Sequence, residues 1–453
     1  MVRKRKFTLS TTQIILLSFL VTILIGSGLL ALPISSASKE AVPYLDALFM
    51  STTSVCVTGL VTLPTVSTWS IFGQIVILLL IQIGGLGIIT IMSGLMLLLN
   101  RKMGISDRLL IQDSFNLNTM SGLAKFVKNV LFGTLIIEGL GAILYMLVFV
   151  PELGAKGIWI SIFNSVSAFC NAGIDIIAEN SLCDYATNPL INIVTSVLII
   201  LGGLGYIVWW DVIRVIKNRT KKNRKIFRYL TLHSKIAITV TAGLIFVGAI
   251  LIFVFEYDNP LTIGKMSLFD KIQASFFQSV TTRTAGFASV PQENLTDASA
   301  TVSIILMLIG GSPVGTAGGI KTVTIAVLVC SAFATIRNKN SATLFGRRIS
   351  EESVKKAVAV AVTFLMICIA SSVLLMATSN ASALDAVYEA VSATATVGLS
   401  RNLTSTLNTL GKLIIIITMY FGRVGPISLA VALGSKSESQ NVISEPTEDI
   451  SIG

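Results

Sequence analysis

The sequence is poor in charge and in histidine, and its cysteines lack the spacing of metal sites. Charged residues make up 13% of the 453 residues, about half the share of a soluble domain. The single histidine, His233, lies in a basic stretch, and no catalytic triad, His-Glu-x-x-His motif or carboxylate pair falls in an apolar segment. The five cysteines form no Cys-x-x-Cys pair and are expected to pack as small apolar residues. These absences argue against an enzyme, a protein-held metal centre and an organic cofactor.

Long apolar runs take the place of charge. Hydrophobic residues make up 53% of the chain, and the mean hydropathy is +0.82. Runs long enough to cross a bilayer occur as four pairs, which predicts eight transmembrane spans. The runs are Ile14–Leu32, Ile71–Leu99, Val130–Val150, Ile191–Ile216, Ile236–Phe255, Val302–Phe333, Val358–Ala377 and Leu413–Leu433. Arg3–Lys6 and the first run look like a signal peptide, but that run is long enough to be a retained helix.

Most of the 34 Lys and Arg residues fall at the N-terminus or between the pairs of runs. Short basic loops stay on the cytoplasmic side of a membrane. We therefore expect a multi-pass protein of the cell (inner) membrane with both termini in the cytoplasm, and the net charge of +11 largely reflects this topology. The most basic stretch, residues 217–228, is not accompanied by groove-reading or base-stacking elements. It is expected to face lipid headgroups, and nucleic acid is excluded as a partner.

Four similar stretches recur at almost equal intervals. They read STTSVCVTG, SVSAFCNAG, QSVTTRTAG and AVSATATVG, and they end in Gly59, Gly173, Gly286 and Gly398. Each has an aromatic residue at the same distance before its glycine, namely Phe49, Phe163, Phe276 and Tyr388. Each lies between the two runs of a pair and includes an apolar segment too short to cross a membrane, which predicts a re-entrant half-helix. The period predicts an all-α integral membrane fold of four pseudosymmetric helix–pore half-helix–helix repeats around a central ion pore.

The residues before each glycine are candidates for an ion filter built from main-chain carbonyls. Glycine adopts positive φ at low cost, so an extended strand can turn its carbonyls toward one axis and replace the hydration shell of a cation. The expected strands are Cys56–Val57–Thr58–Gly59, Cys170–Asn171–Ala172–Gly173, Arg283–Thr284–Ala285–Gly286 and Ala395–Thr396–Val397–Gly398. The negative ends of four half-helices would also favour a cation there.

Two groups of charged residues accompany these segments. Asp46 and Asp385 open their half-helices and are expected to act as N-caps. Arg283 is expected to point backward from its strand into the supporting protein. Its expected partner is a carboxylate, and the candidates are Asp270, Glu293 and Asp297.

The second run of repeat three is interrupted by glycine and proline. The interruption reads Gly310-Gly311-Ser312-Pro313-Val314-Gly315-Thr316-Ala317-Gly318-Gly319. In a helix each Gly costs about 1 kcal/mol and Pro about 3 kcal/mol, so this segment should be unwound and should line a cavity. We expect it to be a mobile gate below the filter. A nucleotide-binding loop is not supported, because Ile320 separates glycine from Lys321 and the flank is an apolar helix.

Related glycine motifs occur in the second run of every repeat. Those of repeats one and two, which end at Gly87 and Gly205, are expected to serve close helix packing. In repeat four Arg423 replaces a glycine, and an arginine at membrane depth is a functional candidate. We expect Arg423 to lie near the gate loop, to repel a cation and to hold the loop through carbonyl contacts. The alternative is a structural pair with a carboxylate such as Glu138.

These features divide the chain into six parts. They are a cytoplasmic N-terminal segment (1–12), pore repeat 1 (13–100), a linker and pore repeat 2 (101–218), a basic linker and pore repeat 3 with the gate loop 310–319 (219–334), a linker and pore repeat 4 (335–434), and a polar C-terminal tail (435–453).

The four repeats, the single glycine per filter strand, the broken run of repeat three and Arg423 together resemble the TrkH/Ktr/HKT superfamily of potassium transporters, over residues 10–434. Within it the chain is most similar to KtrB-type membrane subunits of bacterial Ktr systems. The resemblance implies uptake of K+ held at the filter positions, often sodium dependence, a homodimer, and a cytoplasmic KtrA-like ring that binds nucleotide and controls the gate. In related plant members, serine at the first filter glycine accompanies sodium permeation, so Gly59 favours K+.

Three alternatives are weighed against this interpretation. With one glycine per strand, the chain could be a less selective Na+/K+ transporter of the same architecture. Sodium and calcium channels use rings of acidic side chains, but no carboxylate immediately precedes the four glycines. Secondary transporters with inverted repeats would need repeats of opposite topology, whereas these four all enter from the same side.

Overall fold

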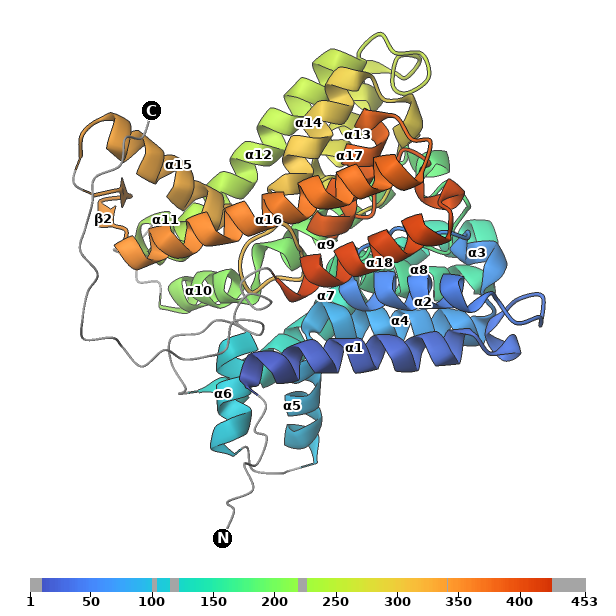
Figure 1. Ribbon diagram of the computed structural model, residues 1–453, viewed down its shortest axis with the longest axis horizontal. Helices are drawn as coiled ribbons and strands as arrows, with labels where there is room; N and C mark the ends of the chain where they lie inside the picture. The colour runs from blue at the N-terminus through green and yellow to red at the C-terminus, as the bar shows by residue number, and fades with distance from the viewer. Residues whose placement is uncertain (1–9, 100–103, 115–121, 219–225, 340, 426–453) are drawn as a thin grey trace.

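The structure is a computed structural model that describes residues 10–99, 104–114, 122–218, 226–339 and 341–425 (Figure 1). The predictions for most of the N-terminal segment, for residues 219–225 of the basic linker, for the end of the last span and for the tail fall outside these residues. The regular secondary structure of the described part is helical apart from one hairpin, in which β1 (Thr343–Leu344) pairs with β2 (Arg347–Arg348). The expected all-α membrane fold is confirmed.

Each repeat opens with a helix that is long and apolar enough to cross a membrane. These helices are α1 (Thr11–Leu30), α7 (Leu123–Leu153), α12 (Leu232–Glu256) and α16 (Glu351–Thr378). Their outward faces carry exposed apolar side chains, for example Ile25, Phe246 and Met366. A surface this apolar suits contact with lipid rather than water.

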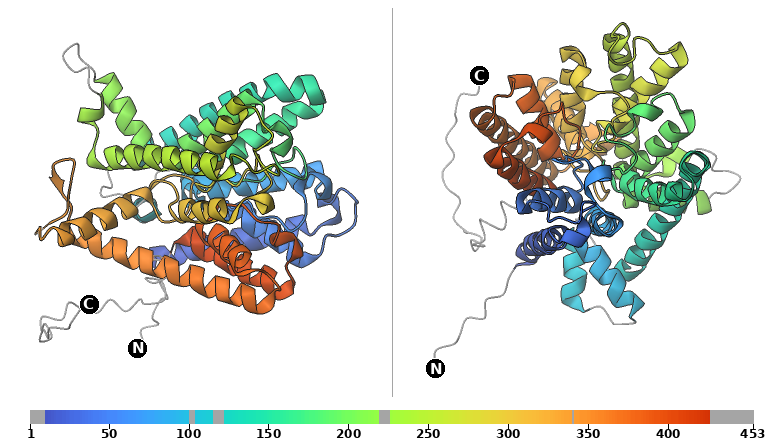
Figure 2. Two further views of the ribbon diagram at one scale, coloured as in Figure 1. Left: turned by 90° about the horizontal axis from the view of Figure 1, so that it is seen from above. Right: turned by 90° about the vertical axis from the view of Figure 1, so that its right-hand side faces the viewer.

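A shorter helix follows each long one and stops just before the glycine of its repeat. These half-helices are α2 (Tyr44–Cys56), α8 (Ala155–Cys170), α13 (Leu268–Thr281) and α17 (Ala383–Ala395). More than half of the residues of each are buried, and the four repeats are arranged around a common centre (Figure 2). The sequence therefore places four helix C-termini in the interior of the molecule.

The second helix of each repeat begins at a polar cap. These helices are α4 (Ile71–Leu86), α9 (Pro189–Leu204), α14 (Asp297–Leu308) and α18 (Thr409–Val424). Side-chain oxygens of Ser70, Asn188, Thr296 and Asn408 accept hydrogen bonds from first-turn N–H groups. Such caps satisfy donors that a helix end would otherwise leave without a partner.

The second runs of repeats one and two are not single helices, contrary to the expected spans Ile71–Leu99 and Ile191–Ile216. Helix α4 bends by 94° into α5 (Ile88–Leu98) and α9 bends by 94° into α10 (Tyr206–Lys217). The breaks lie at Gly87 and Gly205, whose φ values of +85° and +84° are open to glycine at little cost. Close packing does hold for the preceding glycines Gly84 and Gly202, since a Cβ on either would overlap a half-helix carbonyl.

Repeat three is interrupted more widely. Helix α14 ends at Leu308 and α15 begins at Thr322, so the glycine-rich segment between them is not helical. Helix α15 (Thr322–Ile336) leads to the β1–β2 hairpin. The remaining short elements are η1 (Pro33–Ser35), α3 (Thr65–Thr68), α6 (Ile105–Ser114), η2 (Cys183–Tyr185), α11 (Ile226–Tyr229), η3 (Gln292–Asn294) and η4 (Thr404–Thr406).

Candidate functional site

The glycines that close the four repeats form a ring. A Cβ built on each would lie within 2.6 Å of a carbonyl oxygen of the next repeat in sequence order. The oxygens are those of Ala172 for Gly59, Ala285 for Gly173, Val397 for Gly286 and Thr58 for Gly398. Each belongs to the residue just before a filter glycine, and repeat four leads back to repeat one. The four segments therefore converge on one axis, at a spacing that only glycine allows.

The backbone of the four segments shares one pattern of dihedral angles. The residue two before each glycine is left-handed, with φ of 56° at Val57, 58° at Asn171, 64° at Thr284 and 52° at Thr396. The glycines also have positive φ, between 65° and 103°. Left-handed β-branched residues are rare and strained, and such strain collects at functional sites.

The expectation of four-residue extended strands is wrong at the first residue in repeats one, two and four. Cys56, Cys170 and Ala395 are the last residues of their helices. The left-handed residue then ends the helix, as in a Schellman motif, with the N–H groups of Thr58, Ala172 and Val397 each bonded at 2.8 Å to a carbonyl within the half-helix. The left-handed residue turns the chain away from the helix, and the glycine follows two residues later.

Hydroxyl groups of the half-helices hold the chain at or near the glycines. Thr53 Oγ1 accepts from the Gly59 N–H at 2.9 Å, and Ser392 Oγ accepts from the Gly398 N–H at 3.1 Å. Thr281 Oγ1 in repeat three donates to the Phe287 carbonyl at 2.7 Å. These contacts explain Ser and Thr residues near the beginning of the repeated stretches.

Arg283 does not pair with a carboxylate, so that part of the prediction is wrong. Its guanidinium is buried and donates to the Gly310 carbonyl at 2.9 Å and to Thr241 Oγ1 at 3.3 Å. None of the ion pairs among the described residues includes it. Arg283 thus links the repeat-three filter segment to the first residue of the gate loop.

The gate loop packs against repeat two. Its backbone bonds to the break in α9–α10: the Ser312 N–H donates to the Gly203 carbonyl at 2.8 Å, and the Tyr206 N–H donates to the Val314 carbonyl at 3.0 Å. Thr316 is a second point of contact, because its hydroxyl lies 2.9 Å from Asn171 Oδ1 in the filter segment. The loop is therefore bonded directly to the segment of repeat two that precedes Gly173.

Two further cationic side chains, besides Arg283, hold the same loop. Arg423 donates to the Thr316 carbonyl at 2.6 Å and also to the Gly84 carbonyl of α4. Lys321 donates to the Ala317 carbonyl at 2.6 Å. Glu138 accepts from Gln82 at 3.1 Å and forms none of the ion pairs of the described chain. The alternative of an Arg423–Glu138 pair is therefore wrong.

Two cavities lie on either side of these elements. One of 410 Å³ is lined by the four ring glycines and by post-filter residues that include Asp175, Glu179 and Glu293. Another of 440 Å³ is lined by gate-loop residues together with Arg423 and Lys321. The first cavity carries acidic groups suited to a cation. In the loop between α8 and α9, burial raises the pKa of Asp175 to about 6, with opposing hydrogen bonds from Ser181 and backbone N–H groups.

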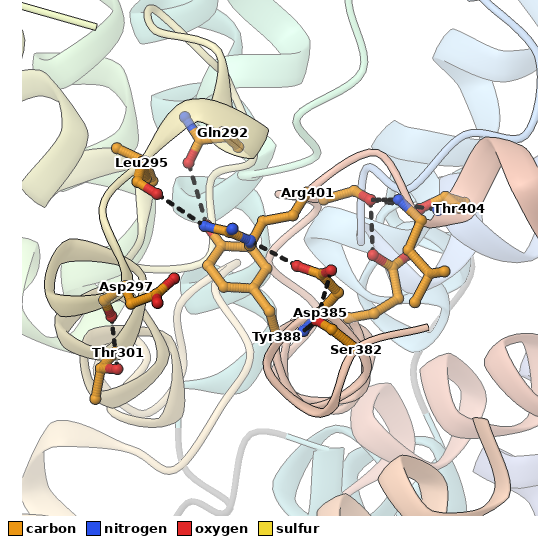
Figure 3. Close-up of polar contacts among 12 residues, drawn as sticks. Gln292, Leu295, Asp297, Thr301, Ser382, Asp385, Tyr388, Arg401 and Thr404 are labelled. Atoms are coloured by element: carbon orange, nitrogen blue, oxygen red, sulfur yellow. Dashed lines mark hydrogen bonds and ion pairs between the residues drawn. The ribbon is translucent and has the colours of Figure 1, made fainter. Parts of the chain in front are cut away.

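Sequence reasoning missed two ion pairs that hold the half-helices. Arg401 Nε lies 2.7 Å from Asp385 Oδ1, and Arg401 also donates to the Leu295 carbonyl at 3.2 Å (Figure 3). Lys412 Nζ lies 2.5 Å from Asp46 Oδ1. Neither aspartate is an N-cap, because the cap positions are Ser382 and Pro43. A signal was present, since Thr62 and Arg401 occupy the same position after their glycines and both bond to the aspartate of their own half-helix.

Comparison with known proteins gives a consistent result. The model of the TrkH family, described as cation transport protein, matches residues 4–444. The potassium/sodium uptake protein NtpJ of Enterococcus hirae is 39% identical, and the alignment covers 100% of this chain and 98% of that protein. The Ktr system potassium uptake protein B of Bacillus subtilis is 37% identical, with 95% of this chain and 94% of that protein covered. The crystal structure of the potassium transporter TrkH from Vibrio parahaemolyticus matches with a TM-score of 0.72 at 16% identity, covering 95% of this chain and 86% of that one, which shows a shared fold.

Proposed function

Because this chain belongs to the TrkH family of cation transport proteins, which are membrane transporters and not enzymes, we propose that it takes up potassium through the ring of four glycines. The closed ring supports this proposal most directly. Each ring contact is backbone to backbone, so carbonyl oxygens of all four repeats are available to replace the water around a dehydrated cation. The half-helices end beside the ring with their negative ends, which adds a favourable field.

The segment 310–319 is proposed as the gate of this pathway. It lies between the filter and the cavity of 440 Å³, and the bonds from Arg283, Lys321 and Arg423 hold it in place. An ion can pass only after the loop moves, which must break some of these bonds. Arg423 would add to the block, since a positive charge in the cavity disfavours a cation there.

Partners and orientation belong to the same proposal. Relatives named Ktr system potassium uptake protein B are subunits of a system by name. The names support the inference of a KtrA-like nucleotide-binding ring as a partner on the basic face. From the family resemblance we also propose a homodimer and Na+ as an activator, and from the basic loops we propose that both termini lie in the cytoplasm. A less selective Na+/K+ transporter is the second candidate, because the relative from Enterococcus hirae is named a potassium/sodium uptake protein.

A bacterium that lacks its own K+ uptake provides the test. Expression of the chain should restore growth at low K+ and rubidium influx. Gly→Ser at each of Gly59, Gly173, Gly286 and Gly398 should abolish or weaken both, because a side chain there overlaps the neighbouring backbone. Gly139→Ser is the matched control, since a Cβ at Gly139 meets nothing within 4 Å.

Growth and influx left intact by all four filter changes would reject the pore assignment. Competition of rubidium influx by excess Na+ separates the two candidate functions. A selective potassium system keeps its influx in excess Na+, whereas the less selective transporter loses it.

A further inference from the structure

A buried carboxylate lies in the half-helix of repeat four without a cation beside it. Glu389 has no exposed surface, and its oxygens accept from the hydroxyls of Ser400, at 2.7 Å, and Thr404. None of the ion pairs in the described part of the chain includes it. An ionisable residue at this depth is costly and marks a functional position by default.

The fold itself does not require an acid at this position. The residues at the same distance before the other three ring glycines are Met50, Asn164 and Phe277. All three are buried like Glu389, so an uncharged side chain fills the equivalent space in every other repeat. Repeat four alone carries an ionisable side chain there.

Glu389 acts on the segment that leaves the filter. Ser400 and Thr404 follow Gly398 closely, and both line the cavity of 410 Å³ above the ring. Ser400 Oγ also accepts from the N–H groups of Leu403 and Thr404, at 3.2 and 3.3 Å. The two carboxylate–hydroxyl bonds therefore determine the path of the chain from the ring to the cavity wall.

A second carboxylate, one helical turn earlier, holds the same segment. Asp385 pairs with Arg401, which reaches on to the Leu295 carbonyl of repeat three (Figure 3). Two acids of α17 thus fix consecutive parts of the post-filter loop. With Asp385 already bonded to the arginine, Glu389 is left to orient the hydroxyls alone.

The chemistry of the contact sets the direction of both hydroxyl hydrogens. The Ser400 and Thr404 hydroxyls both donate to the Glu389 carboxyl oxygens, so both turn their hydrogens toward Glu389. Their hydrogens therefore point away from the cavity. A glutamine would present one oxygen and one NH₂ group, and the hydroxyl facing the NH₂ group would have to reverse.

We propose that Glu389 is a specificity-determining residue of the ion pathway, which fixes the outer rim of the repeat-four filter through the Ser400 and Thr404 hydroxyls. This inference rests on the proposed potassium uptake and extends it to the selection of the ion. Under this proposal, the discrimination between K+ and Na+ depends partly on repeat four, through a residue that does not itself line the cavity of 410 Å³.

The test measures rubidium influx and its competition by Na+ in the bacterium that lacks its own K+ uptake, with each variant present in the membrane at the same protein level. Glu389→Gln should raise the KM for rubidium and lower the K+ over Na+ discrimination, each about tenfold, as expected when one buried hydroxyl loses its hydrogen-bond acceptor, with little change in the maximal rate. Asp297→Asn is the matched control, because Asp297 is exposed nearby and holds Thr301 only through its backbone carbonyl. It should keep wild-type values.

A second pair of variants decides the matter if Glu389→Gln does not accumulate. Thr404→Val removes one donor and should shift KM and discrimination in the same direction, whereas Thr404→Ser keeps the hydroxyl and should restore them. Wild-type KM and discrimination in both Glu389→Gln and Thr404→Val would overturn the inference while leaving potassium uptake in place. A wild-type chain that carries no rubidium would instead overturn the proposed function, and the inference with it.

Discussion

Removal of the Arg423 side chain should open the gate. Arg423 bonds the loop at the Thr316 carbonyl and bonds α4 at the Gly84 carbonyl, so it ties the loop to a fixed helix. Arg423→Ala breaks this tie and removes a positive charge from the cavity below the filter. We therefore expect higher basal influx, with less dependence on any regulatory partner.

The size of the effect follows from the contact that is lost on the loop side. One hydrogen bond from a charged donor contributes about 1.5–3 kcal/mol. At about 1.4 kcal/mol per factor of ten, the balance between closed and open loop should shift by roughly 10- to 150-fold. Arg423→Lys should give an intermediate result, because an ammonium is a compact point charge and lacks the planar fork that serves two carbonyls at once.

Rubidium influx into proteoliposomes that contain only this chain measures the effect without a partner. Arg337→Ala, which removes an exposed arginine after α15, is the control for net charge. Basal influx and thermal stability that stay at wild-type values in Arg423→Ala would show that Arg423 does not hold the loop closed. A fall in influx together with a large loss of stability would assign Arg423 to structural support instead.

Two further predictions concern the segments that follow the ring glycines. Burial raises the pKa of Asp175 to about 6, so its charge is mostly present at pH 7 and mostly lost at pH 5. Rubidium influx should therefore decline as the pH falls from 7 to 5. Asp175→Asn should give a lower influx that no longer changes over this pH range. A decline that persists unchanged in Asp175→Asn would assign the titration to another group. The Asp385–Arg401 pair is only partly exposed, at 31% and 12% of its side chains, and a double-mutant cycle of Asp385→Asn and Arg401→Met should give a coupling of about 1 kcal/mol in thermal unfolding. A coupling indistinguishable from zero would show that the contact seen in Figure 3 does not contribute to stability.

The sequence was most informative where the structure depends on the backbone alone. The spacing of the four glycines located the ends of the half-helices. A ring of main-chain contacts tolerates different side chains at the neighbouring positions, but it requires glycine where the backbones meet. The cluster of glycines and proline around Pro313 likewise predicted a non-helical segment, since helix propensity falls sharply there. In both cases a local rule was enough.

The sequence was least informative where backbone groups replace side-chain partners. Arg283 was expected to meet a carboxylate, yet it meets a carbonyl of the gate loop, and carbonyls leave no mark in a sequence. The bends at Gly87 and Gly205 were missed because the apolar run continues on both sides of each glycine, so hydropathy does not change at the break. The left-handed φ at Val57 was missed for a different reason, because a β-branched residue gives no local signal of positive φ.

The closed glycine ring has a consequence for how such a protein can evolve. The four quadrants of the ring are encoded separately in one chain, so a single substitution alters one quadrant and leaves the other three unchanged. A channel assembled from identical subunits would receive every substitution four times over. This chain can instead keep an arginine in its third quadrant and a carboxylate in its fourth, and natural selection can adjust each of them independently.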